Sequence, residues 1–133
     1  MIYLDSNIFI YAALNIAPEA ENCLRIMDKI VRGDVEVGTS VLTWDEIFQS
    51  IKKKLGSDYA RISGQRFLNL VNLNFFDADL EVLSVAQKLT EKYNLGPRDA
   101  IHAATAVVNG CKEIITDDSD FDKIKELKRI KIK

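Results

Sequence analysis

The sequence contains only two cysteines, Cys23 and Cys111, and they lack the CxxC spacing of zinc and redox sites. Nothing in the chain is typical of a secreted protein, so we expect free thiols in a reducing compartment and no zinc site. No stretch approaches the roughly 18 uninterrupted apolar residues of a membrane span, and the N-terminus lacks the basic segment of a signal peptide. These absences predict a cytoplasmic protein.

Glycine and proline are also scarce, with six and two residues, and 47% of the chain is hydrophobic. This composition excludes disordered, collagen-like and coiled-coil proteins. The formal net charge of −2 excludes a general polyanion binder. A nucleic-acid enzyme is still compatible, because metal ions can supply the positive charge that phosphate requires. At 133 residues the chain fits one domain, residues 1–133, large enough for its own core.

Short apolar segments with strand character alternate with helical patterns along the chain. The strand segments are 2–4, 35–37, 72–76, 114–115 and 129–132. The helical segments are 6–14, 18–33, 40–55, 59–71, 82–94 and 97–110. Strands separated by helices predict a mainly parallel sheet covered on both faces, which is a single-domain α/β sandwich. Segment 129–132 alternates Lys with Ile, as is typical of an exposed sheet edge.

The helix beginning at Pro97 has two contrasting sides. Its predicted buried face consists of Ala100 or Ile101, Ala104, Val107 and Val108. The opposite side carries Arg98, His102, Thr105 and Asn109. Asp99 and His102 could be a D-x-x-H metal pair, but a lone exposed or hydrogen-bonded histidine is the common case. Tyr3 is predicted to be a core residue.

Basic residues are concentrated in the middle of the chain, at Lys52, Lys53, Lys54, Arg61 and Arg66. These side chains could hold RNA phosphates, or they could form an ordinary solvated helix face.

Several acids follow strands or begin helices. Asp5 ends the first strand, Asp99 lies in the first turn of a helix, and Asp118 follows strand 114–115. Each has an ordinary explanation, as an N-cap for Asp5, a first-turn acid for Asp99 and a turn residue for Asp118. Because ligands bind outside the carboxyl ends of parallel strands, these three carboxylates could also meet at one site. Capping alone does not require that convergence.

Crowded carboxylates would favour a hard metal ion. Two carboxylates about 4 Å apart repel by roughly 4 kcal/mol at an effective dielectric constant of about 20. Such repulsion either raises a pKa or recruits a cation. Oxygen-only ligands select Mg²⁺, and Mn²⁺ accepts the same ligands. One ion or two would be compatible with the acids present. Such an ion can lower the pKa of a bound water and neutralise charge on a phosphoryl group.

Four segments carry a family resemblance. They are I-Y-L-D-S-N-I-F-I at 2–10, S-V-L-T-W-D-E-I at 40–47, G-P-R-D-A-I-H-A-A-T at 96–105 and I-I-T-D-D-S-D-F at 114–121. In this order and spacing they resemble the PIN-domain ribonucleases, most of all the VapC-type toxins and their archaeal relatives. The resemblance spans nearly the whole chain and implies a PIN-like α/β fold.

The resemblance also implies roles for individual residues. Asp5 and Asp99 correspond to the principal metal ligands, Glu46 to the third acid and Asp118 to the fourth. Asp117 occupies a variable position of the T-x-D-x-D-F pattern, although its acidity leaves the choice open, and Asp120 is the next candidate. Ser6, Asn7 and Thr116 would orient carboxylates or water.

Glu46 itself can be read in two ways. It could be the capping-box partner of Thr43. It also lies off the apolar stripe of its helix, so as a site acid it is expected at the rim of the cleft.

The implied activity is an endoribonuclease that depends on Mg²⁺ or Mn²⁺ and leaves 5′-phosphate and 3′-hydroxyl ends. In the toxin branch a small antitoxin would plug the cleft with an Arg or Lys, and a homodimer is expected. The alternatives are an rRNA-processing PIN nuclease and a non-catalytic RNA- or protein-binding PIN domain, which is disfavoured because all the acids are present. A receiver-like domain would need a phosphoacceptor Asp after a central strand with a nearby Lys, and no stretch fits.

Overall fold

Five short strands form one parallel sheet in the computed structural model, which describes residues 1–132. In spatial order the strands are β3 (Leu73–Phe76), β2 (Val37–Ser40), β1 (Ile2–Leu4), β4 (Glu113–Ile115) and β5 (Lys128–Ile130). The register places Tyr3 of β1 beside Gly38 on one side and Ile114 on the other. The predicted parallel sheet is confirmed, and the Lys/Ile segment does form an edge strand.

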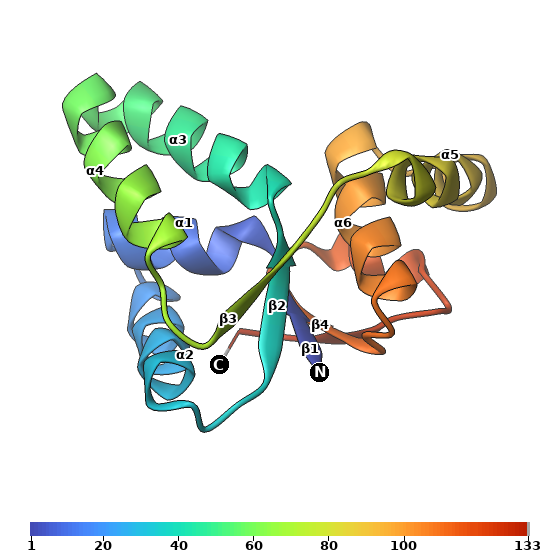
Figure 1. Cartoon of the computed structure of the whole chain (residues 1–133), viewed down its shortest axis with the longest axis horizontal. Helices are drawn as coiled ribbons and strands as arrows, with labels where there is room; N and C mark the ends of the chain where they lie inside the picture. Colours follow the sequence, from blue (N-terminus) through green and yellow to red (C-terminus); the bar gives the residue numbers. More distant parts are fainter. Residues whose placement is uncertain (133) are drawn as a thin grey trace.

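Helices cover both faces of this sheet (Figure 1). In chain order they are α1 (Ser6–Leu14), α2 (Ala20–Arg32), α3 (Leu42–Leu55), α4 (Ser57–Leu68), α5 (Leu80–Tyr93), α6 (Pro97–Val108) and the 3-10 helix η1 (Ser119–Lys123). Figure 1 shows α1 to α4 on one side of the strands and α5 with α6 on the other. The predicted α/β sandwich is therefore confirmed. Within residues 1–132 no helix has the length and apolar character needed to cross a bilayer.

Two apolar layers hold the helices to the sheet. One layer packs α5, α6 and η1 against Tyr3 and Ile114, and the other packs α1 to α4 against Leu4 and Val37. Tyr3 and Leu4 serve different layers because adjacent residues of a strand point to opposite faces. Each is fully buried, and burial of one large apolar side chain stabilises the fold by about 1.5–3 kcal/mol. The next residue, Asp5, is thereby held between two packed layers.

Several predicted boundaries are wrong by one to three residues; the helix predicted at 59–71, for example, is α4 at Ser57–Leu68. The second strand begins at Val37 rather than Val35 and continues to Ser40. Its ladder with β1 and β3 covers only this range, so strand pairing decides the bounds and local β-branched character does not. The helix predicted from Pro18 begins at Ala20.

The buried face of α6 also differs from the prediction. Ala100 and Ala104 are buried as expected, whereas Ile101 is only half-buried and His102 and Thr105 are fully buried. The physical reason is that α6 contacts both α5 and β2, so two of its sides face protein. A helix enclosed in this way has no single apolar stripe for a periodicity argument to find.

Gly38 provides a test of how tightly the sheet packs. A Cβ atom at this position would lie 2.3 Å from the ring of Phe76. We therefore expect Gly38→Ala to lower the free energy of unfolding by about 1–3 kcal/mol through overpacking, measured by thermal or urea unfolding. Gly96→Ala is the control, because a Cβ there meets no atom within 4 Å. Equal losses for the two variants would contradict the close contact with Phe76.

Candidate active site

The Asp5 carboxylate lies directly after β1 and is fixed at both oxygens. Its Oδ1 accepts the backbone N–H of Ser6 at 2.7 Å, and its Oδ2 accepts the Thr116 hydroxyl at 2.6 Å. The N-cap role expected from the sequence is therefore confirmed for Oδ1. The second oxygen binds a residue that follows β4. Only 7% of the Asp5 side chain is exposed, so this carboxylate depends on these donors rather than on bulk water.

The Thr116 hydroxyl connects Asp5 to the segment after β4. Besides donating to Asp5, it accepts the Asn7 side-chain N–H at 3.2 Å and the Asp118 backbone N–H at 3.1 Å. These three hydrogen bonds use the one donor position and both acceptor positions of the hydroxyl. Asn7 Oδ1 is buried and has no hydrogen-bond donor among residues 1–132, so it can accept a hydrogen bond from water. Of the three residues predicted to orient carboxylates or water, Thr116 contacts Asp5 through its hydroxyl, Ser6 does so through its backbone N–H, and Asn7 contacts Thr116.

Three further carboxylates converge at this end of the sheet. They belong to Asp99 in the first turn of α6, Asp118 at the N-cap of η1, and Asp120 in its first turn. One ligand oxygen from each lies within 4.8 Å of the other two. Asp117 is not part of this group, because its Oδ2 accepts the Tyr11 hydroxyl at 2.9 Å. The structure therefore places Asp118, and not Asp117, beside Asp99.

Crowding changes the acidity of Asp99. Burial, together with the negative charges of Asp118 and Asp5, raises the pKa of the Asp99 carboxyl to about 7. A cation placed among these oxygens would relieve that repulsion. The donor set consists of carboxylates, with the unpaired Asn7 Oδ1 nearby, and oxygen donors suit hard divalent ions. The residues present fit a Mg²⁺ or Mn²⁺ ion.

Glu46 reaches the site from α3. The capping box with Thr43 is absent, because α3 begins at Leu42 and the buried Thr43 hydroxyl pairs with Thr39 at 2.7 Å. Glu46 Oε1 instead binds His102 Nε2. The Glu46 side chain is 17% exposed, which agrees with the expected position at the rim.

His102 is a partner of the acids that the sequence argument did not identify. It was expected to be exposed or hydrogen-bonded; it is hydrogen-bonded, but it is fully buried. Nε2 binds Glu46, and Nδ1 lies 2.5 Å from the Tyr3 hydroxyl, so a metal pair with Asp99 is not formed. Burial opposes the charged form of His102, yet the hydrogen bond to Glu46 and the charge of Asp5 raise its pKa above the ordinary value.

Tyr3 is buried as predicted, but its hydroxyl reaches the site. The available signal was that a buried tyrosine usually finds a hydrogen-bond partner for its hydroxyl. Nothing in a single sequence indicates which residue that partner is.

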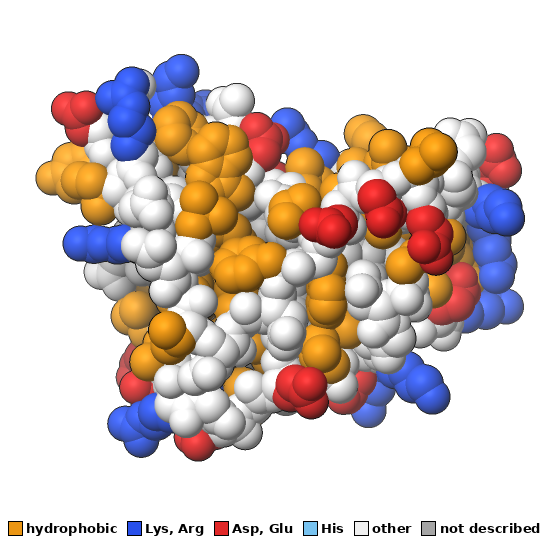
Figure 2. All heavy atoms as spheres, viewed as in Figure 1, with side chains coloured by type: hydrophobic (Ala, Val, Ile, Leu, Met, Phe, Trp, Pro, Cys, Tyr) orange, Lys and Arg blue, Asp and Glu red, His pale blue; other side chains and the backbone are white. Residues whose placement is uncertain are grey.

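The basic residues considered from the sequence lie apart from the acids. Lys52, Lys53 and Lys54 are in the last turn of α3, at the opposite end of the helix from Glu46. Arg98 is closer, because it precedes Asp99, and its side chain is 61% exposed with Nη2 3.5 Å from Asp45 Oδ2. On the face seen in Figure 2, Lys and Arg side chains lie at the margins and hydrophobic side chains occupy the middle.

Comparison with known proteins gives consistent results. The PIN domain pattern matches residues 2–127. Ribonuclease VapC6 of Methanocaldococcus jannaschii is 26% identical over 101 residues, which cover 76% of this chain and 60% of that protein. The match thus spans less than two thirds of this relative.

Solved structures share the fold over nearly the whole chain. VapBC2 from Rickettsia felis, bound to a DNA fragment from its promoter, superposes with a TM-score of 0.75 at 20% identity and covers 98% of both chains. A toxin–antitoxin complex from Klebsiella pneumoniae superposes with a TM-score of 0.66 at 24% identity over 96% of both chains.

The raised pKa of Asp99 should make stability depend on pH. Because the folded carboxyl holds its proton more tightly than the unfolded one, the free energy of unfolding falls as pH rises from about 4 to about 7. We expect Asp99→Asn to be more stable than the parent in metal-free buffer at about pH 8, by about 1 kcal/mol because Asp99 is only half-buried. At about pH 4 the two proteins should be equal.

Urea unfolding across this pH range measures the difference. Asp58→Asn is the matched control, since the Asp58 side chain is 95% exposed and should leave the pH dependence unchanged. An Asp99→Asn variant that is less stable than the parent at both ends of the range would indicate that Asp99 acts only as a helix cap.

Proposed function

This chain belongs to the PIN-domain family, and from that premise we propose that it is a metal-dependent endoribonuclease that hydrolyses RNA phosphodiester bonds. The observation that carries the proposal is the group of Asp99, Asp118 and Asp120 carboxylates, with Asp5 linked to it through Thr116 and Glu46 linked to Asp5 through His102. They come from four separate parts of the chain. Helix capping would satisfy each acid locally and would not bring them together.

Asp5, Asp99, Asp118 and Glu46 would hold Mg²⁺, or Mn²⁺ as a substitute, with Asp120 as an additional oxygen donor. When bound, such an ion lowers the pKa of water and neutralises charge that develops on the phosphoryl group. The protein itself supplies a fixed arrangement of carboxylates. Ser6 and Thr116 orient Asp5, and Thr116 also anchors the segment that carries Asp118. Groups fixed in advance need no reorganisation during the reaction.

Arg98 is the basic side chain best placed to receive RNA. It is exposed and adjacent in sequence to Asp99, and its contact with Asp45 is long at 3.5 Å. Exposed ion pairs of this kind contribute only about 0–1 kcal/mol, so a substrate phosphate can displace Asp45 at little cost. In this arrangement Arg98 binds the RNA backbone beside the acids.

The activity is tested with single-stranded or loop RNA in Mg²⁺ or Mn²⁺. We expect cleavage in the presence of either ion and none after exhaustive chelation. Asp118→Asn should lower the cleavage rate at least about tenfold more than Asp117→Asn, a difference of about 1.4 kcal/mol in transition-state stabilisation. Asp117 is the matched control because it is the neighbouring acid and contacts Tyr11 instead of the cluster.

Full activity in protein shown by elemental analysis to be free of metal would disprove metal dependence. Equal losses for the Asp118 and Asp117 variants would mean that the two acids share the role, and parent-like rates for both would contradict a role for Asp118 in the reaction.

We further infer a protein partner, because the chain shares its fold with the subunits of toxin–antitoxin complexes. A hollow of about 300 Å³ between α1, α2 and α4 is a suitable docking place. Its lining includes Phe9, Leu24, Met27 and Phe67, with Arg66 as a basic group. This lining suits an amphipathic segment of a small antitoxin that carries aliphatic side chains and one acid. A basic side chain of the same partner would reach the acidic cluster. The homodimer expected from the family resemblance is a further prediction.

The partner is tested by co-expression with the product of a short adjacent reading frame. We expect the parent and Gln49→Glu to co-purify with it, and Ala13→Glu to lose it while still cleaving RNA. Both substitutions add one negative charge at an exposed site, but only Ala13 lines the hollow. Retention by Ala13→Glu would place the partner elsewhere. No co-purification with the parent would favour the rRNA-processing alternative.

A further inference from the structure

His102 and Tyr3 make contacts to which the proposed reaction assigns no role. His102 is the single histidine of the sequence, and both of its ring nitrogens are engaged by other elements. Nδ1 meets Tyr3 of β1, and Nε2 meets Glu46 of α3. Nε2 also lies 3.6 Å from Asp5 Oδ1. The imidazole ring therefore lies between a buried strand residue and two acids of the site.

The hydrogen bonds around Tyr3 and His102 determine which ring nitrogen of His102 carries a proton. The Tyr3 hydroxyl oxygen accepts the backbone N–H of Ser40 at 3.0 Å. Burial raises the pKa of Tyr3 well above its usual value, so the phenol keeps its own proton and needs an acceptor. Among residues 1–132 that acceptor is His102 Nδ1. Nε2 then carries a proton and donates it to Oε1 of the Glu46 carboxylate.

The result is a chain of donors that runs in one direction. It starts at the Ser40 backbone, passes through Tyr3 and His102, and ends on the Glu46 carboxylate. Thr105, one turn further along α6, shows the contrast. It is equally buried, but its hydroxyl donates at 2.6 Å to Ile101 O within the same helix. A buried polar residue of α6 can thus be satisfied locally, whereas His102 makes its bonds to β1 and α3.

We propose that His102 is a positioning residue, supported by Tyr3, whose Nε2–H holds the Glu46 carboxylate in place beside Asp5. The N–H lies between the carboxylates of Glu46 and Asp5, so it allows Glu46 to approach the site. This inference rests on the proposed function, because positioning Glu46 affects metal binding only if the acids form the metal site. Removing an outer hydrogen-bond partner of a metal ligand typically lowers metal affinity about 10–100-fold.

Two substitutions separate the two nitrogens of the ring. In His102→Gln the side-chain amide can occupy the position of Nε2 and still donate to Glu46. In His102→Asn the shorter amide can reach only the position of Nδ1, beside Tyr3. Mn²⁺ binding to RNA-free protein, measured by calorimetry or electron paramagnetic resonance, reports on the site without relying on activity. We expect the Gln variant to bind Mn²⁺ within about threefold of the parent and the Asn variant at least about tenfold more weakly.

The same pair is then compared in a Glu46→Gln background, which shows whether His102 acts through Glu46. We expect the difference between Gln and Asn at position 102 to disappear there, because the carboxylate that His102 orients is gone. A difference that persists would overturn the proposal. Equal Mn²⁺ affinity of the Gln and Asn variants in the parent background would also overturn it, since a purely space-filling histidine predicts no preference for one nitrogen.

Nuclear magnetic resonance tests the hydrogen bond directly, even if a variant at position 102 does not fold. Because the chain has one histidine, its ring signals in a long-range ¹H–¹⁵N spectrum need no assignment by mutation. A proton on Nε2 supports the proposal, and an Nε2 without a proton overturns it. A parent protein that neither binds Mn²⁺ nor cleaves RNA would overturn the proposed function together with this inference. A parent that does both, with Gln and Asn variants that are equal, would overturn only the positioning role.

Discussion

Carboxylates at the carboxyl end of the sheet repel one another, and the fold has to hold them together. At about 4 Å each such pair costs roughly 4 kcal/mol at an effective dielectric constant of about 20. The protein offsets part of this cost with donors: the Ser6 N–H and the Thr116 hydroxyl on Asp5, and the His102 ring on Glu46. A hydrogen bond to a charged group contributes about 1.5–3 kcal/mol, so two or three of them are comparable to the repulsion of one carboxylate pair. Asp99 faces Asp118 and Asp5 instead, and its pKa is the one that rises to about 7.

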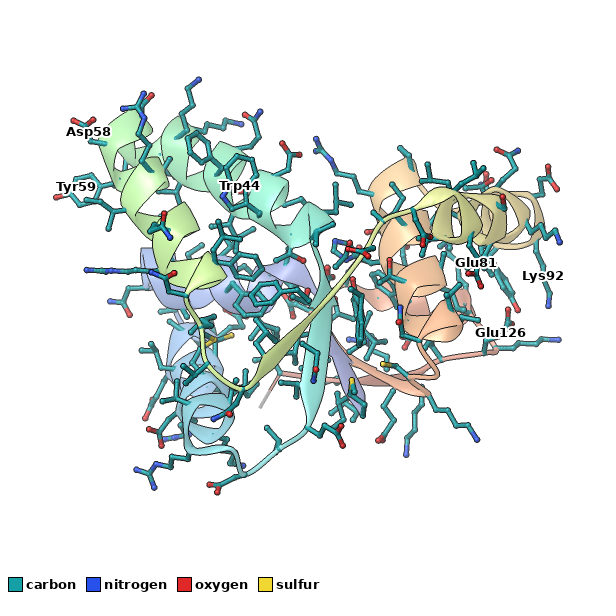
Figure 3. All side chains as sticks on the ribbon, viewed as in Figure 1. Trp44, Asp58, Tyr59, Glu81, Lys92 and Glu126 are labelled. Atoms are coloured by element: carbon teal, nitrogen blue, oxygen red, sulfur yellow. The ribbon has the colours of Figure 1, made fainter. Side chains whose placement is uncertain are left out.

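The two apolar layers make this arrangement possible because they fix the strand that carries Asp5. Tyr3 and Leu4 are buried in opposite layers, so β1 can neither rotate nor slip by one residue without moving each side chain into the layer that is packed for the other. Tyr3 has a second use, since its ring belongs to the core and its hydroxyl to the site. Stability and site geometry therefore depend on the same residue. Charged pairs such as Lys92 with Glu126 lie at the periphery and are not involved (Figure 3).

The sequence predicts features that depend on the local residue pattern, such as an acid at the end of a strand. It does not predict features that depend on packing between elements, such as the burial of a polar side chain. Asp5 and Asp118 could be expected at one edge because the strands before them were recognisable and parallel strands share an edge. The burial of His102 could not be foreseen, because α6 is enclosed on two sides and four of its twelve residues are alanine, which gives the apolar periodicity little contrast. The separation of Asp117 from Asp118 follows from Tyr11, a contact across 106 positions of the chain. The bounds of β2 were misplaced because its partners, and not its own residues, define them.

The order of the strands determines when the acidic site can assemble during synthesis of the chain. β1 is made first but occupies the centre of the sheet, and one of its two neighbours, β4, comes from the last part of the described chain. Thr116, which fixes one oxygen of Asp5, follows β4, and so does Asp118. A chain still growing on the ribosome therefore carries Asp5 and Glu46 long before it can assemble them with the remaining acids. For an enzyme proposed to cut RNA, the ribosome that makes it is working beside a nuclease whose site is still incomplete.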